Sequence, residues 1–109
     1  MPADPSEWRS MGKVFMVYLL ANRKNGAIYT GVSGYPERRL MQHKDGVLEG
    51  FTKRYDIDRL VWFEFFEDAR LAIQREKRIK EWKRAWKIRL IEEINPDWRD
   101  LSREIIPTI

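Results

Sequence analysis

The chain contains no cysteine, and this absence excludes disulfide bridges and thiolate metal sites. It also lacks an apolar run long enough for a bilayer, since its longest, residues 14–21, falls short of the about 20 residues needed. Residues 1–12 carry acids and prolines where a signal peptide would have an apolar core. We therefore expect a cytoplasmic protein in which residues 1–12 form a flexible tail and residues 13–109 form one domain.

What the sequence does contain is enough apolar material for a single core. Of its 109 residues, 43% are hydrophobic, including five tryptophans, five phenylalanines and four tyrosines, so the chain should fold as a globule. The net charge of +4 is unevenly distributed, because residues 70–89 hold nine Lys/Arg and only two Glu. Such a run is typical of a solvated helix face and also of a surface for an anionic partner.

Three segments rich in β-branched and aromatic residues predict strands, at residues 14–21, 27–32 and 59–66. Asn25-Gly26, between the first two, is a hairpin signal because both residues tolerate positive φ. Residues 46–58 are mostly polar and predict an irregular connection.

Proline and glycine mark the ends of the expected helices. A short helix should begin at Pro36 and end before Gly46. Residues 68–93 have a helical pattern that breaks near residues 82–84, and Asn95-Pro96 should stop it. The order β-β-α-β-α-α predicts an α+β fold with two layers, in which a small three-stranded antiparallel sheet is flanked by helices.

Glu76 is the most informative residue of the long helical stretch. The helical repeat groups positions 69, 72, 73, 76 and 79 on one face, where Glu76 is the only charged side chain. An inward carboxylate is costly unless it is paired, hydrogen-bonded or bound to a metal. Three interpretations stay open: a buried ion pair, a partly exposed edge of the stripe, or an anchor for Mg²⁺.

Arg39 and His43, the only histidine, share one face of the short helix because they are four residues apart. Together they suit a guanidinium that binds a phosphate and an imidazole that moves a proton, or simply two polar residues on a surface helix. Arg38 is adjacent but points elsewhere.

Tyr18 and Tyr29 fall on the two strands of the predicted hairpin, roughly opposite each other. Cross-strand aromatic pairs are ordinary sheet stabilisers, whereas a catalytic tyrosine needs nearby cations because its phenol has a pKa of about 10. Arg39 and a hydrated metal on Glu76 would supply them. Gly31 suits a point where the backbone closely approaches a helix or a substrate.

These positions together resemble the GIY-YIG nuclease superfamily, in particular its small single-domain bacterial members. The signature tyrosines match "MVY" and "YTG", the helix arginine and histidine match "ERRLMQH", and the metal-binding glutamate matches "QREKRIKEW". Asn95 in "NPDW" matches the asparagine near the end of the domain, although its position also suits a helix stop with an Asx turn. Two departures, the missing first glycine and Thr30 in place of isoleucine, fall at structural positions.

The resemblance implies a Mg²⁺-dependent endonuclease that hydrolyses DNA through a single metal ion, with Mn²⁺ as a substitute and DNA repair as a setting. Glu76 would hold the metal, and Arg39 would balance charge on the phosphoryl group. Tyr18, helped by Tyr29 and His43, would activate or position water, and Asn95 would hold the phosphate or the site geometry.

The expected partner is DNA, with structured or branched forms among the candidates, bound by a monomer or weak dimer without a membrane or a small-molecule cofactor. The backbone phosphates would follow basic side chains that read no sequence, at Lys53, Arg75, Lys77, Lys80 and Lys83. Two alternatives stay open. One is a non-catalytic nucleic-acid-binding module, which has no use for an inward carboxylate, and the other is a partner-binding protein that uses Trp82, Trp86 and Trp98.

Overall fold

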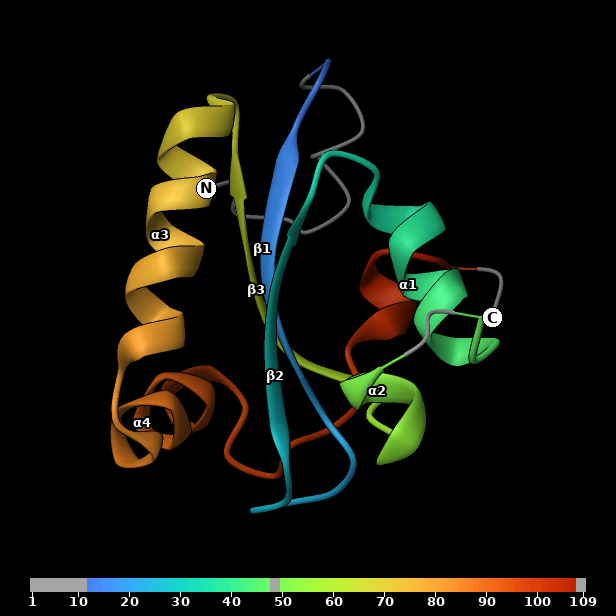
Figure 1. The fold of residues 1–109 in the computed structure, drawn as a ribbon, viewed down its shortest axis with the longest axis vertical. Coiled ribbons are helices and arrows are strands. Elements are labelled where there is room, and N and C mark those ends of the chain that lie inside the picture. The colour runs from blue at the N-terminus through green and yellow to red at the C-terminus, as the bar shows by residue number, and fades with distance from the viewer. Residues whose placement is uncertain (1–11, 48–49, 108–109) are drawn as a thin grey trace.

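The computed structural model describes residues 12–47 and 50–107, and its central sheet stands between two groups of helices (Figure 1). Strands β1 (Phe15–Ala21), β2 (Ile28–Ser33) and β3 (Arg59–Phe66) pair antiparallel in the order β2-β1-β3. The helical segments are α1 (Pro36–Lys44), α2 (Phe51–Arg54), α3 (Ala69–Glu81), α4 (Arg84–Ile94) and the 3₁₀ turn η2 (Ser102–Glu104). The predicted α+β fold and its element order are confirmed. Except for Gly12, the expected tail lies outside the described residues.

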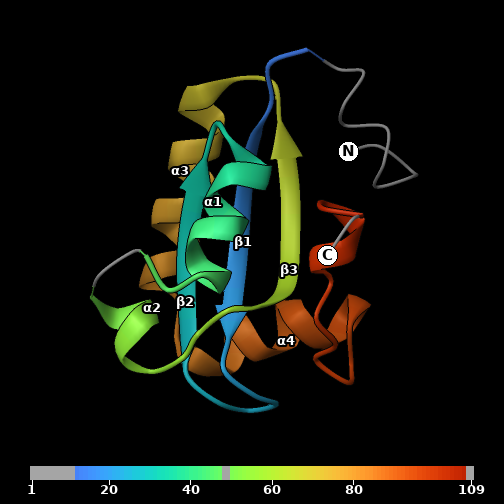
Figure 2. The same ribbon diagram turned by 90° about the vertical axis from the view of Figure 1, so that its right-hand side faces the viewer.

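The helices form a layer on each face of the sheet. α3 and α4 cover one face, and α1, α2 and the C-terminal segment lie on the other (Figures 1 and 2). No helix within residues 12–47 and 50–107 has the length and apolarity needed to cross a membrane.

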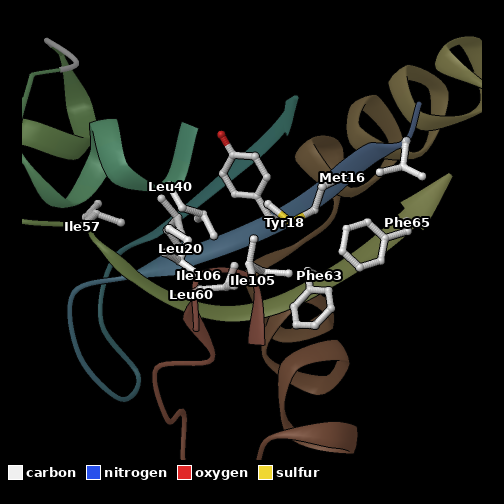
Figure 3. Close-up of a cluster of buried hydrophobic side chains, with 11 residues drawn as sticks. Met16, Tyr18, Leu20, Leu40, Ile57, Leu60, Phe63, Phe65, Ile105 and Ile106 are labelled. Atoms are coloured by element: carbon white, nitrogen blue, oxygen red, sulfur yellow. The ribbon is translucent and has the colours of Figure 1, made fainter. Parts of the chain in front are cut away.

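β1 is the central strand, and burial on both faces explains why its sequence is continuously apolar. The face toward α1 contributes to a cluster with Met16, Tyr18, Leu20, Leu40 and Ile105 (Figure 3). The face toward α3 and α4 contributes to a cluster with Val17, Leu19, Ala72, Ile79 and Ile91. Burying each large apolar side chain stabilises the fold by about 1.5–3 kcal/mol relative to exposure.

The predicted hairpin is present, but its loop is longer than a two-residue Asn25-Gly26 turn. Ala21 pairs with Ile28, so residues 22–27 connect the strands. Only Asn25 has a positive φ, of 58°, and Gly26 does not. The Asn22 side chain closes the loop instead, since its Oδ1 accepts the Ala27 N–H at 3.0 Å.

The helix ends follow the predicted signals. Gly46 ends α1 with a φ of 67°, and its N–H donates to the His43 carbonyl at 3.2 Å. The predicted break between α3 and α4 is present, because Trp82 and Lys83 have extended ψ angles of 150° and 149°. The prediction of an irregular chain over residues 46–58 is wrong in part, because α2 adds a helical turn there. That turn is stabilised by Ile57, a core residue whose N–H donates to the Thr52 carbonyl at 2.8 Å.

Candidate active site

The two signature tyrosines lie on the same face of the hairpin but are diagonal neighbours, not opposite each other. Tyr18 pairs with Gly31, and Tyr29 pairs with Leu20. The ring centroids of the two tyrosines are 6.4 Å apart. Tyr18 is buried in the core with its hydroxyl directed out of the apolar cluster (Figure 3), and Tyr29 is half-buried.

Gly31 allows the Tyr18 ring to reach across the edge strand β2. A Cβ at Gly31 would lie 2.5 Å from both Cζ and the hydroxyl oxygen of Tyr18, closer than real Cβ contacts come. The close approach expected at this glycine is therefore made by the phenol ring of Tyr18. An edge strand without a side chain at this position leaves the hydroxyl close to the rim of the sheet.

Gly31→Ala is expected to lower the free energy of unfolding by about 1–3 kcal/mol, because the new methyl group must displace the Tyr18 ring from a packed core. Urea denaturation of both proteins measures the difference. Gly34→Ala is the control with a milder clash, since a Cβ there would lie 3.0 Å from both Lys13 Nζ and Phe15 Cε1, against 2.5 Å at Gly31. Equal destabilisation by the two substitutions would contradict this account of Gly31.

His43 joins the tyrosines from α1, one turn after Arg39. Its Nε2 lies 3.2 Å from the Tyr18 hydroxyl oxygen, within hydrogen-bonding distance. Its ring centroid is 5.9 Å from that of Tyr18 and 5.6 Å from that of Tyr29. Burial, and then the charge of Arg39, lower the pKa of His43 from 6.5 to about 4, so the imidazole is neutral at neutral pH.

Lowering the pH from about 6.5 to about 4 is expected to destabilise the protein through His43. The unfolded chain binds a proton near the ordinary pKa of 6.5, whereas the folded chain binds it only near 4, so protonation in this window favours unfolding. The contribution is on the order of 1–3 kcal/mol. Urea denaturation at several pH values should show a shallower pH dependence for His43→Gln than for the wild type. Equal slopes would contradict the burial of a neutral His43.

The Tyr18 hydroxyl is the point at which the predicted residues meet. Burial raises the pKa of Tyr18 well above its ordinary value of 10.0, and Tyr29 and Glu76 raise it further. Arg39 opposes this rise through its charge and a side-chain hydrogen bond. Tyr18 is therefore a neutral phenol at neutral pH, and four predicted site residues act on it.

Glu76 reaches this region from α3, on the opposite face of the sheet. Its Oε2 is buried and has no hydrogen-bond partner in the described part of the chain. Glu76 takes part in none of the ion pairs found there, so the buried-ion-pair interpretation fails. The predicted stripe is narrower than expected, because Ile73 is 44% exposed while Ala72 and Ile79 are buried. Glu76 is half-buried at the border of that stripe.

The open oxygen of Glu76 fits a divalent cation. Mg²⁺ prefers oxygen ligands and often takes one or two carboxylates, completing its shell with water and phosphate oxygens. Within residues 12–47 and 50–107, no group of three or more His, Cys, Asp or Glu could hold a metal ion. An ion at this site would have Glu76 as a protein ligand and would complete its shell with other oxygens.

The structure does not bring Asn95 into this cluster. Its side-chain nitrogen donates to the carbonyls of Val61 and Arg99 at 3.2 and 2.9 Å, and its Oδ1 accepts the Arg99 N–H at 3.0 Å. Val61 belongs to β3, the edge strand opposite β2. Asn95 thus joins the end of α4 to β3, in agreement with the helix-stop interpretation.

Four of the five predicted phosphate-binding residues are exposed: Lys53, Lys77, Lys80 and Lys83. Arg75 differs from them, because its Nε donates to Glu64 Oε1 on β3 at 3.0 Å. Glu64 therefore holds Arg75 against β3, and the expected contact of Arg75 with phosphate stays a prediction. No local pattern signals this pair, since its members lie on different elements.

Thr30, expected at a structural position, is also a polar residue of this region. It is buried, and its Oγ1 has no partner among the described residues. Since side chains alternate along β2, Thr30 points away from Tyr18 toward the face covered by α3. The signal that would have found it is a hydroxyl in a strand position where isoleucine is usual.

Two tyrosines and a histidine thus gather beside one face of the small sheet, and the charges of Arg39 and Glu76 act on the Tyr18 hydroxyl. The family model of the GIY-YIG catalytic domain matches residues 14–89. The chain belongs to the GIY-YIG family, part of an endonuclease superfamily.

Within this family the chain is similar to small proteins named UPF0213. It is 35% identical to UPF0213 protein CPE1444 of Clostridium perfringens over 82% of this chain and 95% of that protein. It is 34% identical to a UPF0213 protein of Aeromonas salmonicida over 94% of this chain and 74% of that protein. The solution NMR structure of UPF0213 protein BH0048 from Bacillus halodurans covers 83% of this chain and 95% of its own, with 26% identity and a TM-score of 0.52.

Proposed function

We propose that the chain is a Mg²⁺-dependent endonuclease that hydrolyses phosphodiester bonds in DNA with a single metal ion. The observation that carries the proposal is the buried, unpartnered Oε2 of Glu76. Burying a carboxylate oxygen without a hydrogen-bond donor costs folding free energy, and such an oxygen is suited to bind a cation. The charge of Glu76 also acts on the Tyr18 hydroxyl, which supports one site shared with Arg39 and His43.

Glu76 would hold the metal ion, with Mn²⁺ as a substitute for Mg²⁺. When bound, the ion would polarise the scissile phosphate and stabilise the leaving oxygen. Arg39 is half-buried, with part of its surface open to a ligand, and would balance the charge that develops on the phosphoryl group.

Tyr18 and His43 would move the proton of the attacking water. In this proposal the water gives a proton to the Tyr18 hydroxyl oxygen, while Tyr18 gives its own proton to His43 Nε2, 3.2 Å away. The water oxygen forms a bond to phosphorus, the bond to the leaving oxygen breaks, and the leaving oxygen takes a proton from solvent water. His43 has a free lone pair for this step because its pKa of about 4 keeps it neutral. The ring of Tyr29 lies beside the rings of Tyr18 and His43, and Tyr29 would help to position the water.

The exposed lysines would hold the DNA backbone without reading its sequence. Lys77 and Lys80 lie on the helix that carries Glu76, and Lys83 follows it directly. Lys53 lines a hollow beside His43, on the other face of the sheet. Asn95 would act on site geometry through β3, without contacting the phosphate. Binding through such lysines weakens strongly with added salt.

The test is a cleavage panel of branched, flapped, single-stranded and double-stranded DNA with Mg²⁺ or Mn²⁺, and with EDTA as the control. Matching RNA substrates identify which nucleic acid is used. The proposal expects metal-dependent cleavage of at least one DNA form. Binding without cleavage of any substrate would favour the alternative, a non-catalytic nucleic-acid-binding module that keeps the nuclease fold.

A further inference from the structure

The tryptophans of the α3–α4 region have different environments. Trp98 is completely buried, and its Nε1 donates to Glu92 Oε2 at 2.8 Å, so it belongs to the core. Trp86, on α4, is 51% exposed. An exposed tryptophan is unusual, because its large apolar surface stabilises a protein only when it is covered. The core therefore accounts for Trp98 but leaves Trp86 without a role.

Trp86 is held in place by a series of contacts among aromatic rings and one guanidinium. Its ring meets the ring of Trp82 edge-on, with centroids 6.2 Å apart. The Arg75 guanidinium lies 5.5 Å from the Trp82 centroid and 5.8 Å from that of Trp62 on β3. Glu64 holds Arg75 in turn through the bond described above. Trp86 is thus the exposed end of a preorganised array, which reduces the entropy lost when a ligand binds.

The surface beside Trp86 is hollowed and carries charge. Trp82, Trp86, Arg89, Leu90 and Glu93 line the hollow, which we name the tryptophan platform. Arg89 supplies a cation there, and Glu93 lies one turn further along α4. Nearby, burial and then the charges of Lys80 and Arg84 lower the pKa of Lys87, as expected where positive charges crowd together.

The tryptophan platform and Glu76 lie on different sides of α3. Arg75 and Trp82 contact the β3 side, whereas Glu76 acts on Tyr18 near the β2 edge. Lys77, Arg78 and Lys80 are exposed on the face of α3 between them. These three cations offer successive contacts for a polyanion that passes from one side of the helix to the other.

We infer that the tryptophan platform binds a single-stranded segment of the nucleic acid by stacking a base on Trp86. A duplex hides its base faces, whereas a single strand presents them to aromatic side chains with little regard to sequence. The inference rests on the proposed function for the class of ligand and deepens it. In this inference one nucleic-acid substrate contacts the protein at two places. Its cleavable phosphate lies at Glu76, and an unpaired strand continues around α3 to Trp86.

Binding is measured in EDTA, so that no cleavage is required, by fluorescence anisotropy of a labelled oligo-dT and of a duplex of equal length. Trp86→Ala is expected to weaken oligo-dT binding about fivefold or more, with a smaller effect on the duplex. Trp86→Phe should keep most of the affinity, because a phenyl ring still stacks. Tyr55→Ala is the matched control, since Tyr55 is an exposed aromatic with the Arg54 guanidinium 5.6 Å from its ring centroid.

Tryptophan fluorescence supplies a direct sign of stacking. Oligo-dT should quench the wild-type emission, and Trp86→Phe should remove most of that quenching while it preserves binding. Equal effects of Trp86→Ala and Tyr55→Ala, or quenching unchanged in Trp86→Phe, would overturn the inference. Concentration-dependent dimerisation that Trp86→Ala abolishes would also overturn it, by assigning the hollow to a second copy of the chain. If the wild type cleaves no substrate of the panel but these binding results are obtained, the nuclease proposal alone is rejected and the inference about Trp86 stands.

Discussion

Glu76→Gln is expected to reduce DNA cleavage about 1,000-fold or more while DNA binding in EDTA stays close to that of the wild type. The amide keeps the size of the carboxylate but removes the negative charge that would hold the metal, whose stabilisation of the transition state is worth several kcal/mol. Initial cleavage rates across Mg²⁺ concentrations, with the substrate identified in the panel, measure the loss.

The stability of Glu76→Gln separates a functional role from a structural one. Oε2 accepts no hydrogen bond from the described residues, so removing the charge should not lower the free energy of unfolding. Glu81→Gln is the control, since Glu81 is an exposed carboxylate at the end of the same helix. A Glu76→Gln protein that cleaves at the wild-type rate would refute the assignment of the metal to Glu76.

Arg39→Ala is expected to reduce cleavage about 100- to 1,000-fold, because it removes the cation that balances charge on the phosphoryl group. Arg38→Ala is the matched control at the neighbouring position of α1. Arg38 is exposed with its guanidinium 4.8 Å from the Tyr35 ring centroid, whereas Arg39 acts on Tyr18 and His43. Equal losses in the two variants would indicate a general effect of charge on DNA binding.

Arg39→Ala has a second measurable effect, on the pKa of His43, which can be tested without a substrate. Arg39 is one of the two causes that lower the pKa of His43, so its removal should raise that pKa from about 4 toward 6.5. His43 is the only histidine, so its imidazole resonances in an NMR titration are unambiguous. Burial remains in Arg39→Ala, and the shift should therefore be partial. An unchanged titration would show that Arg39 does not act on His43.

Local signals in the sequence were enough to predict the three strands, the helices α1, α3 and α4 and their order, but not α2. The apolar run of β1, Pro36 and Gly46 around α1, and the break near Trp82 are local signals, because each depends on backbone preferences and on the period of neighbouring side chains. Local geometry also explains why Arg39 and His43 were correctly expected on one face of α1. Which side chains share a face of a strand or helix could therefore be predicted without knowing any contact between distant residues.

Only the tertiary structure decided which side chains meet. The register of β1 and β2 makes Tyr18 and Tyr29 diagonal and lays the Tyr18 ring over Gly31. The packing of α3 on the sheet leaves Glu76 Oε2 without a partner near the site, although the helical period alone also allowed an ion pair.

Arg75 and Asn95 show the limit of local signals most clearly. Arg75 was expected to bind the nucleic acid, and Asn95 to hold the phosphate or the site geometry. In the structure Arg75 pairs with Glu64, and Asn95 bonds to the backbone of β3. In each case the partner is far away in the chain, and its position depends on how whole elements pack. Helix and strand periods are properties of neighbouring residues, whereas a site such as this is a property of the contacts between distant ones, and only the folded chain specifies them.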